Sequence, residues 1–120
     1  MSLRKIAIGT LLLASVGCNG TSTSPSPSPS PTDGTTVSIV AGASVLTTTA
    51  FSPSPVNVPV GTTITWKNND STTHTSTSNS GVWSSSIPPG GQFSVKLDTA
   101  GTYAYHCTIH PGMVGTVNVQ

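Results

Sequence analysis

The sequence predicts an all-β fold, a Greek-key β-sandwich of seven to eight strands that occupies residues 36–120. No apolar spacing of three and four residues, which would mark an amphipathic helix, continues for a dozen residues. Short β-branched segments instead alternate with clusters of Gly, Pro, Asn and Asp, a pattern typical of strands joined by turns. The run DTAGTY at residues 98–103 also resembles the tyrosine corner of Greek-key sandwiches.

The first 17 residues predict a lipoprotein-type signal peptide. Arg4 and Lys5 precede a mostly apolar run of eleven residues, 6–16, which is too short to span a bilayer as a stable helix. The residues SVGC that end at Cys18 look like a bacterial lipobox, in which the chain is cut before a cysteine that receives a lipid. We therefore expect lipidation of Cys18, export, and a periplasmic or cell-surface protein that is lipid-anchored to a bacterial membrane. An ordinary secretory signal and an uncleaved anchor are the alternatives.

Residues 18–35 are expected to comprise the lipidated Cys18 and a tether that follows it. This stretch consists mainly of Thr, Ser and Pro, with Ser and Pro alternating from Pro25 to Pro31, and it is too polar to bury a core. A polyproline II chain rises ~3.1 Å per residue, so residues 19–35 can extend up to roughly 50 Å. The segment therefore gives the folded part reach, or acts as a simple spacer.

The first half of the folded part contains four β-branched candidate strands. Pro53 and Pro55 bend the chain between the second and the third. In the fourth, Ile64 and Trp66 alternate with polar residues and are expected to face the core. The four candidates are residues 37–41, 44–50, 56–60 and 62–67.

The second half continues the same pattern. A turn at residues 68–70 leads to an extended segment that carries His74, and residues 75–80 are expected to be too polar for deep burial. After the turn PPGG, three apolar residues alternate inward along the next strand, and residues 114–119 form the last one. The three inward residues are Phe93, Val95 and Leu97.

The stretch YAYHCTIHPGM at residues 103–113 places three potential metal ligands within seven residues, namely Cys107, His110 and Met113. Cys107 ends an alternating strand on its inward face, whereas His106 points outward. The Pro-Gly pair after His110 cannot continue a central strand but can fold a tight loop that returns His110 and Met113 towards the sulfur. A thiolate, an imidazole and a thioether together suit copper, with a second imidazole supplied from elsewhere.

This loop resembles the ligand loop of the small blue copper proteins, the cupredoxins, and its Cys-x-x-His-x-x-Met spacing is the short form seen in amicyanin, whereas plastocyanin has a longer loop. The resemblance covers residues 35–120 and includes the turn WKNND at 66–70 and His74, which occupies the place of the family's first histidine ligand. It implies one copper ion, Cu(II) or Cu(I), with three strong ligands and a weak axial one. The implied ligands are His74, Cys107, His110 and axial Met113.

Three residues depart from the family pattern. Thr75 stands where amicyanin and plastocyanin usually have an Asn that ties the two ligand segments together, and we expect the hydroxyls of Thr75 and Thr108 to replace that tie. Ile109 stands where Pro is common, and Gly112 where amicyanin has a bulky residue, so the loop is expected to be less stiff. We expect these departures to affect the properties of the copper site and not whether the site is present.

Composition excludes several classes of function. Only 6% of the residues are charged, and no basic stripe is present, so the sequence does not support nucleic-acid binding. There are two cysteines, and if Cys18 carries a lipid, Cys107 has no partner for an intramolecular disulfide. A buried inert thiol is the alternative to a metal-binding one. We expect a monomer.

Other metal centres and enzymes fit less well. A catalytic zinc site of His, His, Cys and water leaves Met113 without a role. A multicopper oxidase needs a His at position 108, where Thr108 stands, and a binuclear copper centre needs a second nearby Cys. A Cys/His hydrolase needs a helix terminus or a cation to activate its thiolate, and the sequence supplies no helix. We therefore expect a protein that is not an enzyme.

The expected function is that of a membrane-tethered type 1 copper one-electron carrier. It would exchange electrons with a redox protein donor and acceptor, such as cytochromes or a dehydrogenase. Docking is expected around His110, where Ile109, Pro111 and Gly112, together with Pro88, can form a small apolar surface. A copper-delivery or storage protein is the alternative, and retention of copper through redox cycles separates the two.

Overall fold

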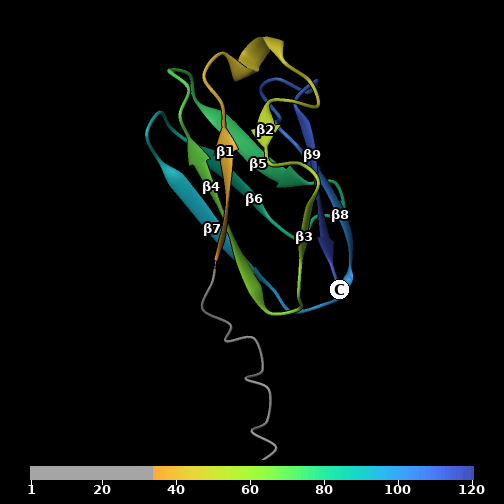
Figure 1. Ribbon diagram of the computed structural model, residues 1–120. Coiled ribbons are helices and arrows are strands. Elements are labelled where there is room, and N and C mark those ends of the chain that lie inside the picture. The colour runs from red at the N-terminus through yellow and green to blue at the C-terminus, as the bar shows by residue number, and fades with distance from the viewer. Residues whose placement is uncertain (1–33) are drawn as a thin grey trace, which may run out of the picture.

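The computed structural model describes residues 34–120, which form two β-sheets packed face to face (Figure 1). Nine strands and one short 3₁₀ helix, η1, make up this part of the chain. Their bounds are β1 Thr35–Ile39, η1 Ala43–Val45, β2 Phe51–Ser52, β3 Val56–Val58, β4 Thr62–Asn68, β5 His74–Ser78, β6 Ser84–Ile87, β7 Gln92–Leu97, β8 Gly101–His106 and β9 Val114–Val119.

The strands are ordered β2-β1-β4-β7 in one sheet and β3-β9-β8-β5-β6 in the other. The pairs β1–β4 and β3–β9 are parallel, and the other pairs are antiparallel. The predicted all-β Greek-key sandwich is therefore confirmed, with nine strands in place of seven or eight. The difference arises from two short elements, β2 and β6, that the sequence did not reveal.

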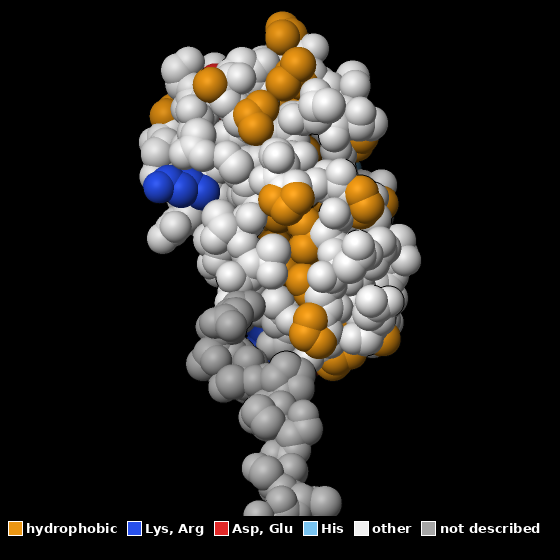
Figure 2. Space-filling model, viewed as in Figure 1, with side chains coloured by type: hydrophobic (Ala, Val, Ile, Leu, Met, Phe, Trp, Pro, Cys, Tyr) orange, Lys and Arg blue, Asp and Glu red, His pale blue; other side chains and the backbone are white. Residues whose placement is uncertain are grey.

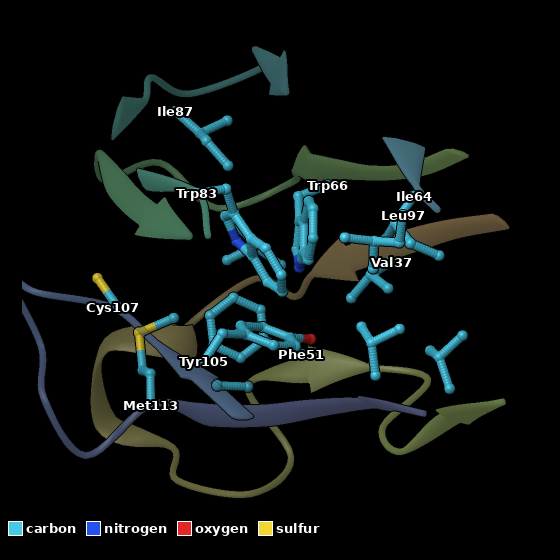
Figure 3. Packing of buried hydrophobic residues seen from close by; sticks show 14 of the residues in the cluster. Val37, Phe51, Ile64, Trp66, Trp83, Ile87, Leu97, Tyr105, Cys107 and Met113 are labelled. Carbon is cyan, nitrogen blue, oxygen red and sulfur yellow. The ribbon is translucent and has the colours of Figure 1, made fainter. Parts of the chain in front are cut away.

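Aromatic rings fill the space between the sheets (Figure 3). Ile64 and Trp66 are fully buried as predicted, and Trp66 contacts the rings of Trp83 and Tyr105, each with its centroid 5.3 Å away. Of the three residues expected to point inward from β7, Leu97 is buried, whereas Phe93 and Val95 are partly buried against the core. Close packing of these rings fixes the position of β8, which leads directly to Cys107.

The predicted tyrosine corner is present at the start of β8. The hydroxyl of Tyr103 donates a hydrogen bond to the carbonyl oxygen of Thr99 at 2.6 Å. This contact joins the strand to the turn that precedes it, so the sequence motif and the structure agree.

The segment 44–50 is not a strand, and that prediction is wrong. Gly42 adopts a positive φ of 75° and turns the chain into η1, whose Ala43–Val45 residues are followed by turns. The β-branched residues that suggested a strand are largely exposed here, because the segment crosses the end of the sandwich and does not pair with a neighbouring strand.

The expectation that residues 75–80 avoid deep burial is also wrong for half of that segment, because Thr75, Ser76 and Ser78 are buried. In β5, Ser76 is fully buried and Ser78 is 4% exposed. The indole N–H of Trp83 donates to the Ser76 hydroxyl at 2.9 Å, and Ser78 shares a hydrogen bond with Ser80 at 3.0 Å. Because these hydroxyls have partners, a polar strand can lie inside the protein.

The two ends of the sandwich differ in what they carry. The loops before β5 and after β8 and the helix η1 lie at the upper end in Figure 1, whereas β1 begins and the chain ends at the lower end. Figure 2 shows hydrophobic side chains at the upper end and few charged groups on the visible face. Within residues 34–120, no helix has the length and apolar character needed to cross a membrane. The predicted signal peptide and Cys18 lie outside the described residues, whereas Thr35, assigned to the tether, begins β1.

Candidate metal centre

The candidate ligands are supplied by two segments that meet at the upper end of the sandwich. His74 is the first residue of β5, Cys107 directly follows β8, and His110 and Met113 lie in the loop that leads to β9. That loop is closed by hydrogen bonds from the Cys107 N–H to the Met113 carbonyl at 3.1 Å and from the Met113 N–H to the His110 carbonyl at 2.9 Å. The turn around Pro111 and Gly112 therefore brings both residues back towards the sulfur, as predicted.

Three donor atoms converge on one point. The Cys107 Sγ lies 3.8 Å from the Nδ1 of His74 and 3.9 Å from the Nδ1 of His110. All three atoms lie within 4.8 Å of one another. A sulfur about 2.3 Å and a nitrogen about 2.05 Å from one ion are about 3.8 Å apart at trigonal angles and about 3.6 Å apart at tetrahedral ones. The two sulfur–nitrogen separations are therefore short enough for all three atoms to bind a single ion.

Burial separates the four residues into two groups. His74, Cys107 and Met113 are fully buried, whereas His110 is partly exposed. Figure 3 shows the sulfurs of Cys107 and Met113 at the same edge of the core. A thiolate and a thioether are soft ligands and imidazole suits copper in both oxidation states, so this donor set fits copper chemically.

The expected tie between the two ligand segments is present at Thr75. Its hydroxyl accepts a hydrogen bond from the Thr108 N–H at 2.8 Å and lies 3.2 Å from the Thr108 hydroxyl. The backbone N–H of Thr75 also donates to the Cys107 sulfur at 3.3 Å, a contact that the sequence did not suggest. These bonds fix the position of the sulfur relative to His74.

Comparison with known proteins supports the same assignment. A family model described as a cupredoxin-like domain matches residues 12–119, which is most of the chain. The chain belongs to the cupredoxin family. It is 38% identical over 84 residues to plastocyanin of Scenedesmus fuscus, across 58% of this chain and 86% of that protein. It is 37% identical over 71 residues to amicyanin of Paracoccus denitrificans, across 54% of each chain.

Solved structures agree with these relatives. The fold matches a purple cupredoxin from Nitrosopumilus maritimus with a TM-score of 0.66 and 33% sequence identity, over 72% of this chain and 99% of that one. It also matches a Cu(I) structure of an amicyanin variant with a TM-score of 0.60 and 28% identity, over 72% of this chain and 82% of the other. The predicted resemblance to small blue copper proteins of the plastocyanin and amicyanin type is confirmed.

In this cupredoxin, a carboxylate contacts the buried histidine, and sequence reasoning missed it. The Oδ2 of Asp70 lies 2.7 Å from the Nε2 of His74. The Oδ1 of Asp70 accepts hydrogen bonds from the backbone N–H groups of Gly42 at 3.0 Å and Ser71 at 2.8 Å. The hydrogen bond with His74, followed by those from the two backbone N–H groups, lowers the pKa of Asp70 to about 2. An Asp four residues before a candidate ligand histidine was the available signal.

The third histidine of the cupredoxin, His106, does not join the site. It projects from the outer face of β8, as predicted, and its Nδ1 lies 2.6 Å from the Asn79 side-chain oxygen. Within the described residues, the cluster of possible metal ligands is therefore confined to His74, Cys107 and His110, with Met113 beside them.

Proposed function

We propose that this cupredoxin is a type 1 copper one-electron carrier in which His74, Cys107 and His110 are the strong ligands and Met113 is the axial one. The observation that carries the proposal is the convergence of two Nδ1 atoms on the Cys107 sulfur at 3.8 and 3.9 Å. A bound copper ion supplies a one-electron Cu(II)/Cu(I) couple at this point. The plastocyanin and amicyanin relatives support the same function.

The protein's own groups favour electron transfer over catalysis. Three of the four proposed ligands are fully buried, so no substrate can reach the metal from their side. The N–H of Thr75 holds the sulfur, and backbone hydrogen bonds close the loop that carries His110 and Met113. A cage that is fixed before binding is suited to holding either oxidation state with little rearrangement.

Redox cycling tests this proposal against the alternative of copper delivery or storage. The purified protein is loaded with Cu(II), then repeatedly reduced and reoxidised in the presence of a Cu(I) chelator, and bound copper is measured after each cycle. A carrier retains its copper and its spectrum through every cycle. Transfer of the metal to the chelator on the first reduction would favour delivery, and no uptake of copper would overturn both readings.

The proposed docking surface for redox partners is the end of the sandwich around His110. His110 is the one partly exposed proposed ligand, and Ile109 next to it is 52% exposed. Val45 of η1, at the same end, is 86% exposed and adds apolar area. The described residues contain two Lys and two Asp, so their formal charge is 2 − 2 = 0. Electron exchange with a partner should therefore vary only mildly with salt concentration, and a steep fall in rate would place docking elsewhere.

The proposed anchor consists of a signal peptide at residues 1–17 and a lipidated Cys18 with its tether to residue 35. In the folded part, β1 begins at the end opposite to the metal centre, so a tether that enters there leaves the His110 surface free for partners. Such a protein would be exported and held at a bacterial membrane. Mass spectrometry of the mature protein tests this, because an unmodified Cys18 excludes the lipid anchor.

A further inference from the structure

The tautomer of His74 affects how strongly this residue can bind a metal. A neutral imidazole carries one proton, and the nitrogen that carries it cannot act as a ligand. In His74 it is Nδ1 that faces the Cys107 sulfur, at 3.8 Å. The proton must therefore reside on Nε2 when Nδ1 binds an ion, so the group that contacts Nε2 influences how readily Nδ1 binds a metal.

Nε2 of His74 has an acceptor-only partner. The Asp70 Oδ2 lies 2.7 Å from it, and the side chains of His74 and Asp70 are 0% and 7% exposed. The other oxygen, Oδ1, already accepts N–H groups from Gly42 and Ser71. A carboxylate in this position offers lone pairs and no proton, so the ring nitrogen must be the donor.

We propose that Asp70 is a positioning residue that selects the Nε2–H tautomer of His74 and thereby prepares Nδ1 to bind the metal. The consequence for copper rests on the proposed function, whereas the tautomer itself does not. A charged acceptor on the far side of the ring also increases the basicity of Nδ1. The more basic nitrogen favours Cu(II) over Cu(I), so Asp70 is expected to lower the reduction potential.

Replacement by asparagine reverses the pattern of donors. If the amide oxygen of Asp70→Asn takes the place of Oδ1, where it accepts the N–H groups of Gly42 and Ser71, the amide NH₂ faces Nε2 of His74. That NH₂ group is a donor, so Nε2 must become the acceptor and the proton moves to Nδ1. If the amide turns over instead, its NH₂ faces two backbone donors. The isosteric variant is therefore expected to favour the tautomer that cannot bind metal.

The tautomer can be measured without any metal. We expect long-range ¹⁵N–¹H NMR spectra of the copper-free protein at about pH 8 to show His74 with its proton on Nε2. Asp70→Asn should move the proton to Nδ1, and Asp70→Ala should give a mixture of both. If the wild-type protein carries the proton on Nδ1, the proposal is overturned, and this measurement needs no variant to fold.

Copper binding supplies the second measurement. Loss of a group that orients a ligand lowers metal affinity by about 10–100-fold, and we expect Asp70→Asn to lose that much Cu(II) affinity and less Cu(I) affinity. Each tenfold difference between the two losses raises the reduction potential by about 59 mV for a one-electron couple. The matched control is Asp98→Asn, which removes the same charge from an exposed residue paired with Lys96, and it should change neither quantity.

The two proposals can fail separately. If the wild-type protein takes up no copper, the proposed function fails, while the NMR result still decides the tautomer. If copper binds normally but Asp70→Asn keeps the wild-type tautomer, Cu(II) affinity and potential, Asp70 has no positioning role.

Discussion

Replacement of Thr75 by valine tests the hydroxyl tie that holds the two ligand segments together. Valine keeps the branched shape but removes the oxygen that accepts the Thr108 N–H at 2.8 Å and contacts the Thr108 hydroxyl at 3.2 Å. A part-buried N–H then has no partner, which lowers stability by about 1–3 kcal/mol. We expect the free energy of unfolding of the copper-free protein to fall by this amount in urea titrations, with an unchanged m-value.

Thr65→Val is the matched control for this prediction. Thr65 also lies in a strand, and its hydroxyl shares a 2.7 Å hydrogen bond with that of Ser94, but this bond lies on an exposed face. We expect the control to change the free energy of unfolding by no more than about 0.5 kcal/mol. If Thr75→Val loses no more stability than Thr65→Val, the hydroxyl does not hold the segments together and the reasoning is wrong.

Three further changes test the site and the core. Cys107→Ser should abolish the visible thiolate-to-copper charge-transfer band, and copper uptake by the wild-type protein without such a band would contradict the proposal that Cys107 is a ligand. In Gly115→Ala, the new Cβ would lie 2.4 Å from the Tyr105 side chain, so we expect the free energy of unfolding, measured by thermal unfolding, to fall by about 1–3 kcal/mol. As a control, Gly112→Ala should change stability little, because the nearest atom to its new Cβ is 3.7 Å away. Burial raises the pKa of Tyr105 to about 12. The nearby Trp66 indole lowers this pKa slightly, although neither its N–H nor the Tyr105 hydroxyl has a hydrogen-bond partner of good geometry. In the unfolded chain, this tyrosine ionises with a pKa of about 10. The folded state favours the neutral phenol, so its contribution to stability is complete below pH ~10 and declines as the pH rises towards about 12. Urea titrations of Tyr105→Phe should not show this decline.

The strands that sequence predicts best are those with one buried face. In β4 the alternation of Thr with Ile64 and Trp66 matches the two faces of a sheet, and the last strand, β9, was predicted with its observed bounds. The loop that carries the candidate ligands was also recognisable, because a thiol, an imidazole and a thioether at fixed spacing are rare in combination. Local pattern therefore determines these elements with little help from the rest of the fold.

What the sequence did not reveal depends on contacts between distant segments. The residues of β6 are mostly serine and have no strand preference of their own, yet they pair with β5 along four positions from His74 to Thr77. Asp70 looked like an ordinary turn residue, because its position four residues before His74 does not by itself show that its side chain points inward. Its role becomes visible only when Gly42, which is 28 residues away, supplies one of its hydrogen bonds.

The two histidines of the centre are held in different ways, and this difference suits the proposed function. His74 is fully buried, with Asp70 at Nε2 on one side of the ring and the Cys107 sulfur facing Nδ1 on the other. His110 lies on a short loop and is partly exposed. Asp70 links the buried histidine to the loop before η1 through its hydrogen bond with Gly42. Thr75, the residue after His74 in β5, links this strand to the loop after β8 through its hydrogen bond with Thr108. Because both links are protein hydrogen bonds, the buried half of the centre is fixed independently of the metal, and the partly exposed His110 is the side of the centre that a partner can approach.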